Sequence, residues 1–272
     1  MSGSNQGQLR REALTIARWA EVGRAPSREV LAKLELLGPD GHEFDYGGQE
    51  TGVGNTYGGD DGGLPDLGPL SDFGSWESVA ATILRRTEES AGFDPSSTVF
   101  DPVAWIRFVC QFQEMPFLTR VVGPDSRSAY ISSLSLLGAV WVVRDLVEWL
   151  VTPDTLTGII NSVKKIGQLA VENEGRQEKD SNVQQGVLTV VDGDLRLGLL
   201  RTTVQMEYET GKGYQHLYQQ ITVSSLFGSL DYGMCKRQAE LLLEWDGQDV
   251  DAWVEGASSS RYPPNTSPAW DN

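Results

Sequence analysis

The 272-residue sequence predicts an α+β fold, in which a helical N-terminal two-thirds packs on an antiparallel β-meander of long strands. Two observations lead to this prediction. Apolar residues recur at helical spacing in several segments between residues 8 and 171. From residue 186 they alternate with a period of two, and turns that contain glycine interrupt them. Helices that cover the apolar face of such a sheet would give one buried core.

The first 37 residues are typical of a helical hairpin. Apolar residues from Leu9 to Ala20 lie at helical spacing, and Gly23 ends the run. Pro26 then opens a second helix, with its apolar side ending at Leu37. Residues 38–74 hold twelve of the thirty glycines, which predicts a Gly/Asp-rich loop or linker, either disordered or wrapped over the surface.

Residues 75–257 are predicted to form the α+β core domain, which starts with four helices. Ser75 is placed to cap the first helix, and Asp101-Pro102 opens the second. The third is expected from Asp125 or Ser126 to about Val151, and the fourth from about Thr155 to Val171. A short helix over 235–245 follows the sheet, and the Ser- and Pro-rich tail 258–272 is expected to be flexible.

The third helix contains Ser128 to Val143, sixteen residues without a charge. A membrane-spanning helix needs about 20 predominantly apolar residues. The sequence therefore favours a buried core helix here and indicates no transmembrane helix. The polar N-terminus lacks the apolar region of a signal peptide, so we expect the chain to be cytoplasmic as synthesised.

Two turns predict the register of the sheet. Asp192-Gly193 is a strong hairpin signal, which puts Leu188 opposite Leu197 and Val190 opposite Leu195. If Gly211-Lys212 forms the second turn, three further pairs follow: Met206 with Leu217, Thr202 with Ile221, and Leu200 with Val223. Residues 201–209 then have a polar face of alternate residues, which begins at Arg201. The apolar phase shifts at Leu199-Leu200, which predicts a β-bulge there.

The composition excludes several classes of function. A net charge of −16 argues against a nucleic-acid partner and disfavours strong attraction to an anionic membrane. Two cysteines, Cys110 and Cys235, are too few for a disulfide scaffold, and we expect both thiols to be buried and inert. With only His42 and His216 besides them, the usual closed zinc sites cannot form.

The sequence predicts no catalytic and no cofactor-binding residue. Gly211-Lys212-Gly213 lacks the glycine and the hydroxyl residue of a phosphate-binding loop, and Gly52–Gly58 has one residue too many for a dinucleotide fingerprint. Whether a metal binds is left open. Two acidic groups are candidates, but a solvated loop is favoured for both: Asp60, Asp61 and Asp66 for calcium, and His42, Glu43 and Asp45 for another metal.

Two further sets of side chains have the chemistry of catalytic groups. His216 falls opposite Glu207 in the predicted register, where a histidine–carboxylate pair could act as a general base. An ordinary cross-strand pair is the favoured interpretation. Ser224, Ser225 and Ser229 have no recognisable partner, and the sequence contains no nucleophile elbow.

The order of elements resembles that of the Cyt-type cytolysins and the related Evf-type virulence proteins. The resemblance covers roughly Tyr130 to Cys235, and its most specific part is the run from Val187 to Val223: strand, Asp192-Gly193 turn, long strand, Gly211-Lys212 turn, strand. It implies helical hairpins on both sides of a sheet of long strands. No sequence motif is matched residue by residue, so it implies no functional residues.

Three functional hypotheses follow. The first is a non-enzymatic, membrane-perturbing or lipid-interacting protein of Cyt-like build, toxin-like in action, with neutral lipid as its partner. The second is a soluble protein-interaction or self-assembly protein, whose partner would be another protein or a second copy of the chain. The third is a carboxylate-based enzyme, with its acidic groups in the Gly-rich segment or on the 201–209 face. An enzyme is less favoured than the other two, and no cofactor is expected.

Overall fold

The centre of the structure is one five-stranded sheet. It is seen in a computed structural model that describes residues 3–21, 50–58, 63–94, 101–131, 137–172, 181–211 and 214–255. The strand order is β1-β3-β4-β5-β2. Only the β1–β3 pair is parallel, and the three other pairs are antiparallel. The strands are β1 (Glu50–Gly58), β2 (Leu118–Ile131), β3 (Ser181–Val191), β4 (Asp194–Gly211) and β5 (Tyr214–Leu230).

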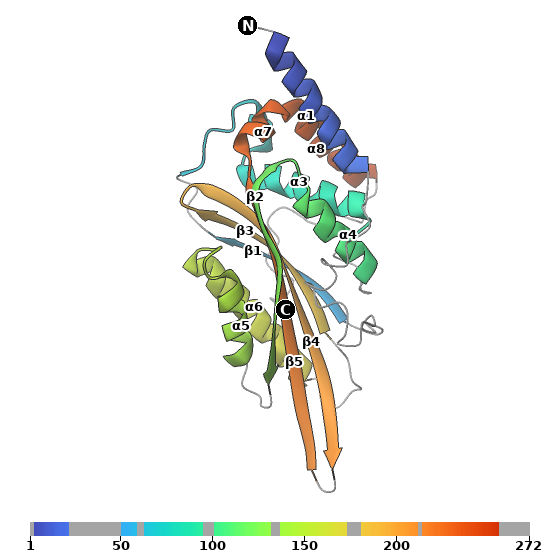
Figure 1. Ribbon diagram of the computed structural model, residues 1–272, viewed down its shortest axis with the longest axis vertical. Helices are drawn as coiled ribbons and strands as arrows, with labels where there is room; N and C mark the ends of the chain where they lie inside the picture. Colours follow the sequence, from blue (N-terminus) through green and yellow to red (C-terminus); the bar gives the residue numbers. More distant parts are fainter. Residues whose placement is uncertain are drawn as a thin grey trace.

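Helices cover both faces of this sheet (Figure 1). One face is covered by α3 (Trp76–Ala91) and α4 (Pro102–Gln113), beyond which lie α1 (Gly3–Glu21), the 3-10 helix η2 (Gly68–Phe73), α7 (Tyr232–Arg237) and α8 (Ala239–Glu255). The other face is covered by α5 (Leu137–Val147) and α6 (Pro153–Glu172). The predicted α+β class is therefore confirmed, with the sheet as the middle of three layers.

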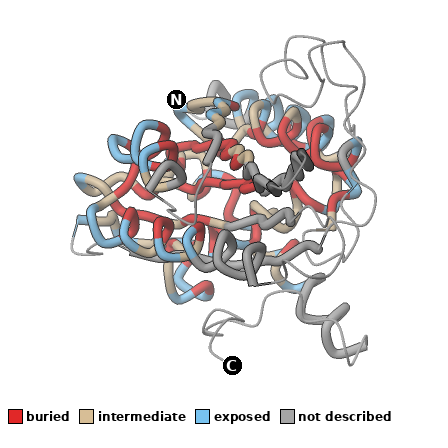
Figure 2. Tube along the Cα trace, turned by 90° about the horizontal axis from the view of Figure 1, so that it is seen from below, coloured by how far each residue is buried: buried red, intermediate tan, exposed pale blue. Residues whose placement is uncertain are grey.

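Each face of the sheet has its own apolar cluster. The first cluster joins Leu195, Leu197 and Leu199 of β4 to α1, α3, α4, α7 and α8. The second joins Leu200 of β4 and Ile221 of β5 to the facing sides of α5 and α6. Figure 2 shows the buried segments gathered where the helices face the strands. The expectation that helices roof the apolar side of the meander is confirmed at Ile221, which is fully buried.

The phase shift at Leu199-Leu200 is not a bulge. The pairing of β4 with β3 and with β5 runs without a register shift through this point. Leu199 belongs to the first cluster and Leu200 to the second, and both are buried. Because successive residues of a strand point to opposite faces, two adjacent leucines can both be buried when both faces are covered. The bulge prediction is wrong for this reason.

The first hairpin is confirmed and the second is displaced. Leu188 pairs with Leu197 and Val190 with Leu195, as predicted. Positive φ angles of 54° at Asp192 and 74° at Gly193 suit the type I′ turn that such hairpins favour.

In the second hairpin Gly211 pairs with Tyr214, so the register is two residues from the predicted one. Met206 pairs with Gln219, Thr202 with Val223, and Leu200 with Ser225. A shift of two leaves every side chain on its predicted face.

Three of the predicted helix positions are confirmed. Ser75 Oγ accepts the N–H of Ser78 at the start of α3, and Asp101 Oδ1 accepts two N–H groups at the start of α4. α6 lies close to its predicted range. The predicted long helix from Asp125 to Val151 is wrong, because its first part belongs to β2.

The serines of that segment explain the difference. Ser126 and Ser128 alternate along β2 and share hydrogen bonds with Ser224 (2.6 Å) and Thr222 (2.8 Å) of β5. Such cross-strand hydroxyl pairs suit an edge strand.

Parts of the N-terminal prediction lie outside the described residues. α1 confirms the first helix of the hairpin, whereas the second helix (residues 26–37) and the tail 258–272 cannot be compared. Residues 38–74 are not simply a loop, since β1 adds a parallel strand to the sheet and η2 contributes the buried Leu70 and Phe73. The division of the chain into domains stays a prediction.

Gly198 provides a test of the packing on the α5–α6 side of the sheet. A Cβ at this position would collide with the ring of Phe227 on the neighbouring strand. We expect Gly198→Ala to destabilise the fold by about 1–3 kcal/mol, because the ring has to move within a packed core. Urea denaturation would measure the change.

The matched control is Gly247→Ala in α8, where nothing lies within 4 Å of the added Cβ. Alanine favours a helix over glycine, so this variant should be more stable by up to about 1 kcal/mol. Equal effects of the two substitutions would contradict the packing described here.

Candidate functional site

The metal candidates of the sequence are not assembled into a site. Asp66 is exposed, and its Oδ1 accepts the N–H of Gly68 at 2.8 Å, so it stabilises a local turn. His42, Glu43, Asp45, Asp60 and Asp61 lie outside the described residues. Within the described part of the chain, no three His, Cys, Asp or Glu side chains are grouped as metal ligands would be.

The predicted acid–base pair is not formed. In the observed register His216 lies opposite Glu209, and Glu207 lies opposite Tyr218. The prediction failed because the register of the second hairpin is shifted by two residues. The polar face that begins at Arg201 is covered at its start, since Arg201 is 4% exposed and its guanidinium lies 5.7 Å from the ring centre of Trp105.

The three candidate serines have structural roles. Ser224, Ser225 and Ser229 are all buried. Ser224 Oγ shares a hydrogen bond with Ser126 Oγ, and Ser229 Oγ donates to Asp194 Oδ2 at 2.8 Å. These contacts hold strands together.

The prediction that both thiols are buried is confirmed for Cys235 and only in part for Cys110. Cys235 is fully buried and Cys110 is half-buried. Burial raises the pKa of both thiols, with the carboxylates of Asp231 near Cys235 and Glu114 near Cys110 adding to the effect. Because the thiolate is the reactive form, neither cysteine is poised as a nucleophile.

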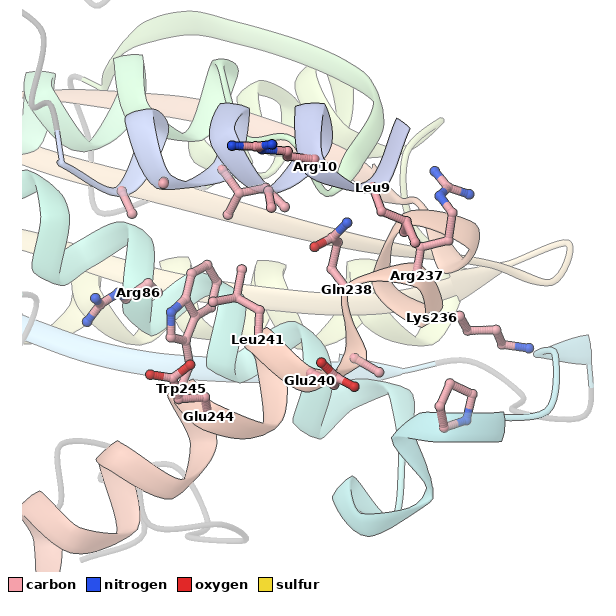
Figure 3. Close-up of a pocket in the computed structure, with 16 residues that line it drawn as sticks. Leu9, Arg10, Arg86, Lys236, Arg237, Gln238, Glu240, Leu241, Glu244 and Trp245 are labelled. Carbon is pink, nitrogen blue, oxygen red and sulfur yellow. The ribbon is translucent and has the colours of Figure 1, made fainter. Parts of the chain in front are cut away.

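A large groove separates α1 from the α7–α8 segment (Figure 3). Its volume is about 860 Å³, within the usual range for ligand sites. The apolar floor includes the buried Ile16 and Trp245, with alanines of α1 between them. α1 is held in place by two reciprocal hydrogen bonds: Trp19 Nε1 donates to the carbonyl of Gln111 at 2.7 Å, and the Gln111 side chain donates to the carbonyl of Trp19.

The rim of this groove is charged. Four basic side chains and two acidic ones line it: Arg10, Arg86, Lys236, Arg237, Glu240 and Glu244. Two of the basic groups lie over aromatic rings, Arg86 at 5.5 Å from the ring centre of Trp245 and Lys236 at 5.9 Å from that of Trp76. Arg86 and Arg237 also form ion pairs, with Glu89 at 3.1 Å and with Glu12 at 3.2 Å, so the rim has no clear excess of either charge. The arrangement suits a partner with an apolar side and charged groups.

A second feature lies on the outer side of the α5–α6 hairpin. Trp141 in α5 and Trp149 in the turn after it are 69% and 59% exposed, the highest values among the exposed large apolar residues of the described chain. Arg144, Asp145 and Glu148 lie between them and are also exposed. Asp145 Oδ2 forms a surface ion pair with Nε of Arg127 in β2, at 3.4 Å.

The helical repeat explains why Trp141 points outward. Val142, Val143, Leu146 and Val147 of α5 are buried in the second apolar cluster. With 3.6 residues per turn, this spacing directs residues 141, 144, 145 and 148 away from the sheet. The same spacing is visible in the sequence, where it could have predicted Trp141 as exposed. The apolar character of the whole segment concealed it.

None of the described helices combines the length and the apolar character needed to cross a membrane.

Comparisons with known proteins give only weak structural likeness. No protein-family model matches the chain, and no curated protein matches it. Among solved structures, the chain is similar to one described as "Structure of the Evf virulence factor", with 11% identity and a TM-score of 0.37 over 94% of this chain and 95% of that chain. This is a weak structural resemblance to an Evf-type protein. The Cyt-type part of the resemblance stays a prediction.

Glu12 connects α1 to α7 and predicts a pH dependence. Its Oε2 accepts hydrogen bonds from Arg237 Nε and Gln238 Nε2, both at 3.2 Å. Burial alone would raise the pKa of this carboxyl, but the hydrogen bonds from Gln8, Arg237 and Gln238 and the charge of Arg237 outweigh it, so the pKa is lowered. A lowered folded-state pKa contributes stability above the ordinary pKa of the group, and this stability is lost as the pH falls through the folded-state pKa.

We therefore expect Glu12→Gln to reduce the free energy of unfolding at pH 7 by about 1 kcal/mol or less, as for other partly exposed ion pairs. The difference from the wild type should shrink in acid, once the wild-type carboxyl is protonated. Urea denaturation at a series of pH values would measure it. Glu240→Gln on the same rim is the control. A Glu12→Gln effect that stays constant from neutral to acid would contradict the assignment.

Proposed function

We propose that this protein is a non-enzymatic lipid-interacting protein that docks on membranes with the outer side of its α5–α6 hairpin and perturbs the bilayer. The observation that carries the proposal is the pair of exposed indoles, Trp141 and Trp149, on one side of this hairpin. Tryptophan is enriched at the membrane–water boundary, since its ring is apolar and its N–H is polar. Two such rings on one surface would anchor it there.

The packing of the hairpin supports a perturbing action. α5 and α6 cover the apolar residues of β4 and β5, which include Leu200, Ile221, Val223 and Phe227. A hairpin that left the sheet would expose this apolar face to its surroundings. Contact of this apolar face with water is unfavourable, whereas contact with lipid chains is not.

The charges of the hairpin indicate the type of lipid. Among residues 140–164 of the hairpin, for which burial is described, the exposed charged residues are Arg144, Lys164, Asp145, Glu148 and Asp154. They give no positive excess, and the whole chain carries −16. An anionic surface attracts basic clusters, so neutral lipid is the expected partner.

The groove of Figure 3 supports a second candidate function. Its apolar floor and charged rim would suit a protein partner that presents an amphipathic segment. In that case the chain would be a protein-interaction protein, and the groove would be occupied in its complex.

Vesicle binding tests the first candidate. We expect the wild type to bind neutral phosphatidylcholine vesicles and release an entrapped dye. Trp141→Ser and Trp149→Ser should each weaken binding about tenfold or more, because a tenfold loss needs only about 1.4 kcal/mol of lost apolar burial. Co-sedimentation and dye leakage would measure both effects.

Leu14→Ser is the matched control, because Leu14 is 54% exposed but lies on α1. It should bind vesicles as the wild type does. A wild type that binds no vesicle, or tryptophan variants that bind unchanged, would refute the proposed membrane surface.

A further inference from the structure

A small pocket lies beside Trp149, between the α5–α6 turn and the sheet. Its volume is about 160 Å³, smaller than the usual site for a drug-sized ligand. Its walls include side chains from β2, β4, β5 and the turn: Arg120, Val122, Trp149, Arg196, Phe227 and Ser229. A pocket of this size suits a small ionic group rather than an extended molecule.

The register of the sheet places two arginines in one row, on the two strands that flank β5. Ser229 of β5 pairs with Arg120 of β2 on one side and with Arg196 of β4 on the other. Side chains of directly paired residues point to the same face of a sheet and lie about 4.5–5.5 Å apart at Cβ. Arg120 and Arg196 therefore flank Ser229 in one row across three strands, on the face that α5 and α6 cover.

The contacts of Arg196 hold its guanidinium in place. Nε donates to Asp194 Oδ2 at 3.3 Å, and Nη1 donates to the carbonyl of Leu150 at 2.9 Å. The same carboxylate oxygen accepts from Ser229 Oγ. Nη2 takes no part in these contacts. Arg196 is thus fixed with donors still available toward the pocket.

Arg120 supplies the second charge. It is exposed, and it forms no ion pair with a described residue. The carboxylate of Asp194 neutralises the charge of Arg196, so the charge of Arg120 remains as one net positive charge in this row. Arg120 and Arg196 line the same pocket on either side of Ser229. Guanidinium groups in one pocket suit the oxygens of a phosphate group, which they can bind through charge-assisted hydrogen bonds.

The wall of the pocket is apolar and aromatic. Val122 and Phe227 lie in the next row of the sheet, where they pair with each other, and Trp149 of the turn also lines the pocket. An aromatic ring next to a phosphate site suits a quaternary ammonium group, as in choline. The pocket also opens beside one of the two exposed tryptophans of the proposed membrane surface.

We propose that this pocket binds a phosphate group, and that its source is the headgroup of a phospholipid. The assignment of a phosphate rests on the arginine row alone. The assignment of a lipid rests in addition on the proposed function. The two parts can fail separately, and the experiment below has one arm for each.

The first arm uses inorganic phosphate and phosphocholine as soluble probes, in calorimetric titrations at constant ionic strength. We expect weak binding, with a dissociation constant on the order of 1 mM. Arg120→Gln should weaken it about tenfold, because a charged hydrogen-bond donor is lost. Arg107→Gln, an exposed arginine of α4 on the opposite face of the sheet, is the control and should bind like the wild type. Unchanged binding by Arg120→Gln, or no binding by the wild type, would overturn the site.

The second arm uses two neutral vesicles with the same acyl chains, one of phosphatidylcholine and one of a galactolipid that lacks phosphate. We expect Arg120→Gln to bind phosphatidylcholine about tenfold more weakly and the galactolipid unchanged. If the variant binds both vesicles as the wild type does but loses the soluble probes, the ligand is free phosphate and the lipid assignment is overturned. If the wild type binds neither vesicle, the proposed function fails, while the soluble probes still decide the phosphate site.

Discussion

The constraint on which the structure depends is that strands β4 and β5 are apolar on both faces. Leu195, Leu197 and Leu199 point to one side of β4, and Leu200 points to the other. An apolar face that stays in water costs about 25 cal/mol for each Å². Both sides of the sheet must therefore be covered, and the helices divide into two groups to do so. The three layers follow from this requirement.

Local signals in the sequence predicted most of the elements. The elements that were predicted wrongly are those that depend on pairing between strands. The caps at Ser75 and Asp101 and the Asp192-Gly193 turn depend on neighbouring residues, and all three were predicted correctly. The second hairpin was displaced because several positions near its glycines could serve as the turn. β2 was missed because its C-terminal part, from Ser128, runs on into an uncharged apolar segment that suits a helix, and only the pairing with β5 makes it a strand.

The surface features were harder to predict than the fold. The helical repeat of α5 contains the signal for Trp141, since one apolar residue in that helix had to face away from the sheet. The arginine row has no such signal. Arg120, Arg196 and Ser229 are far apart in the sequence, and they meet only because three strands pair in one particular register. The groove is likewise lined by residues that are far apart in the sequence, such as Ile16 of α1 and Trp245 of α8.

The row that contains the two arginines also marks the boundary of the hairpin's apolar contact with the sheet. Thr189 of β3 continues this row beyond Arg196, and its hydroxyl shares a hydrogen bond with that of Thr155 at the start of α6. Arg196 donates to the carbonyl of Leu150 in the turn. The turn is therefore held by polar contacts as well as by the burial of Leu150 and Val151, whereas the bodies of α5 and α6 are held by apolar contacts. An apolar medium would replace the apolar contacts of α5 and α6 but not the polar contacts of the turn. A hairpin that moved into lipid would thus pivot about its turn, next to the pocket that we assign to a phosphate group.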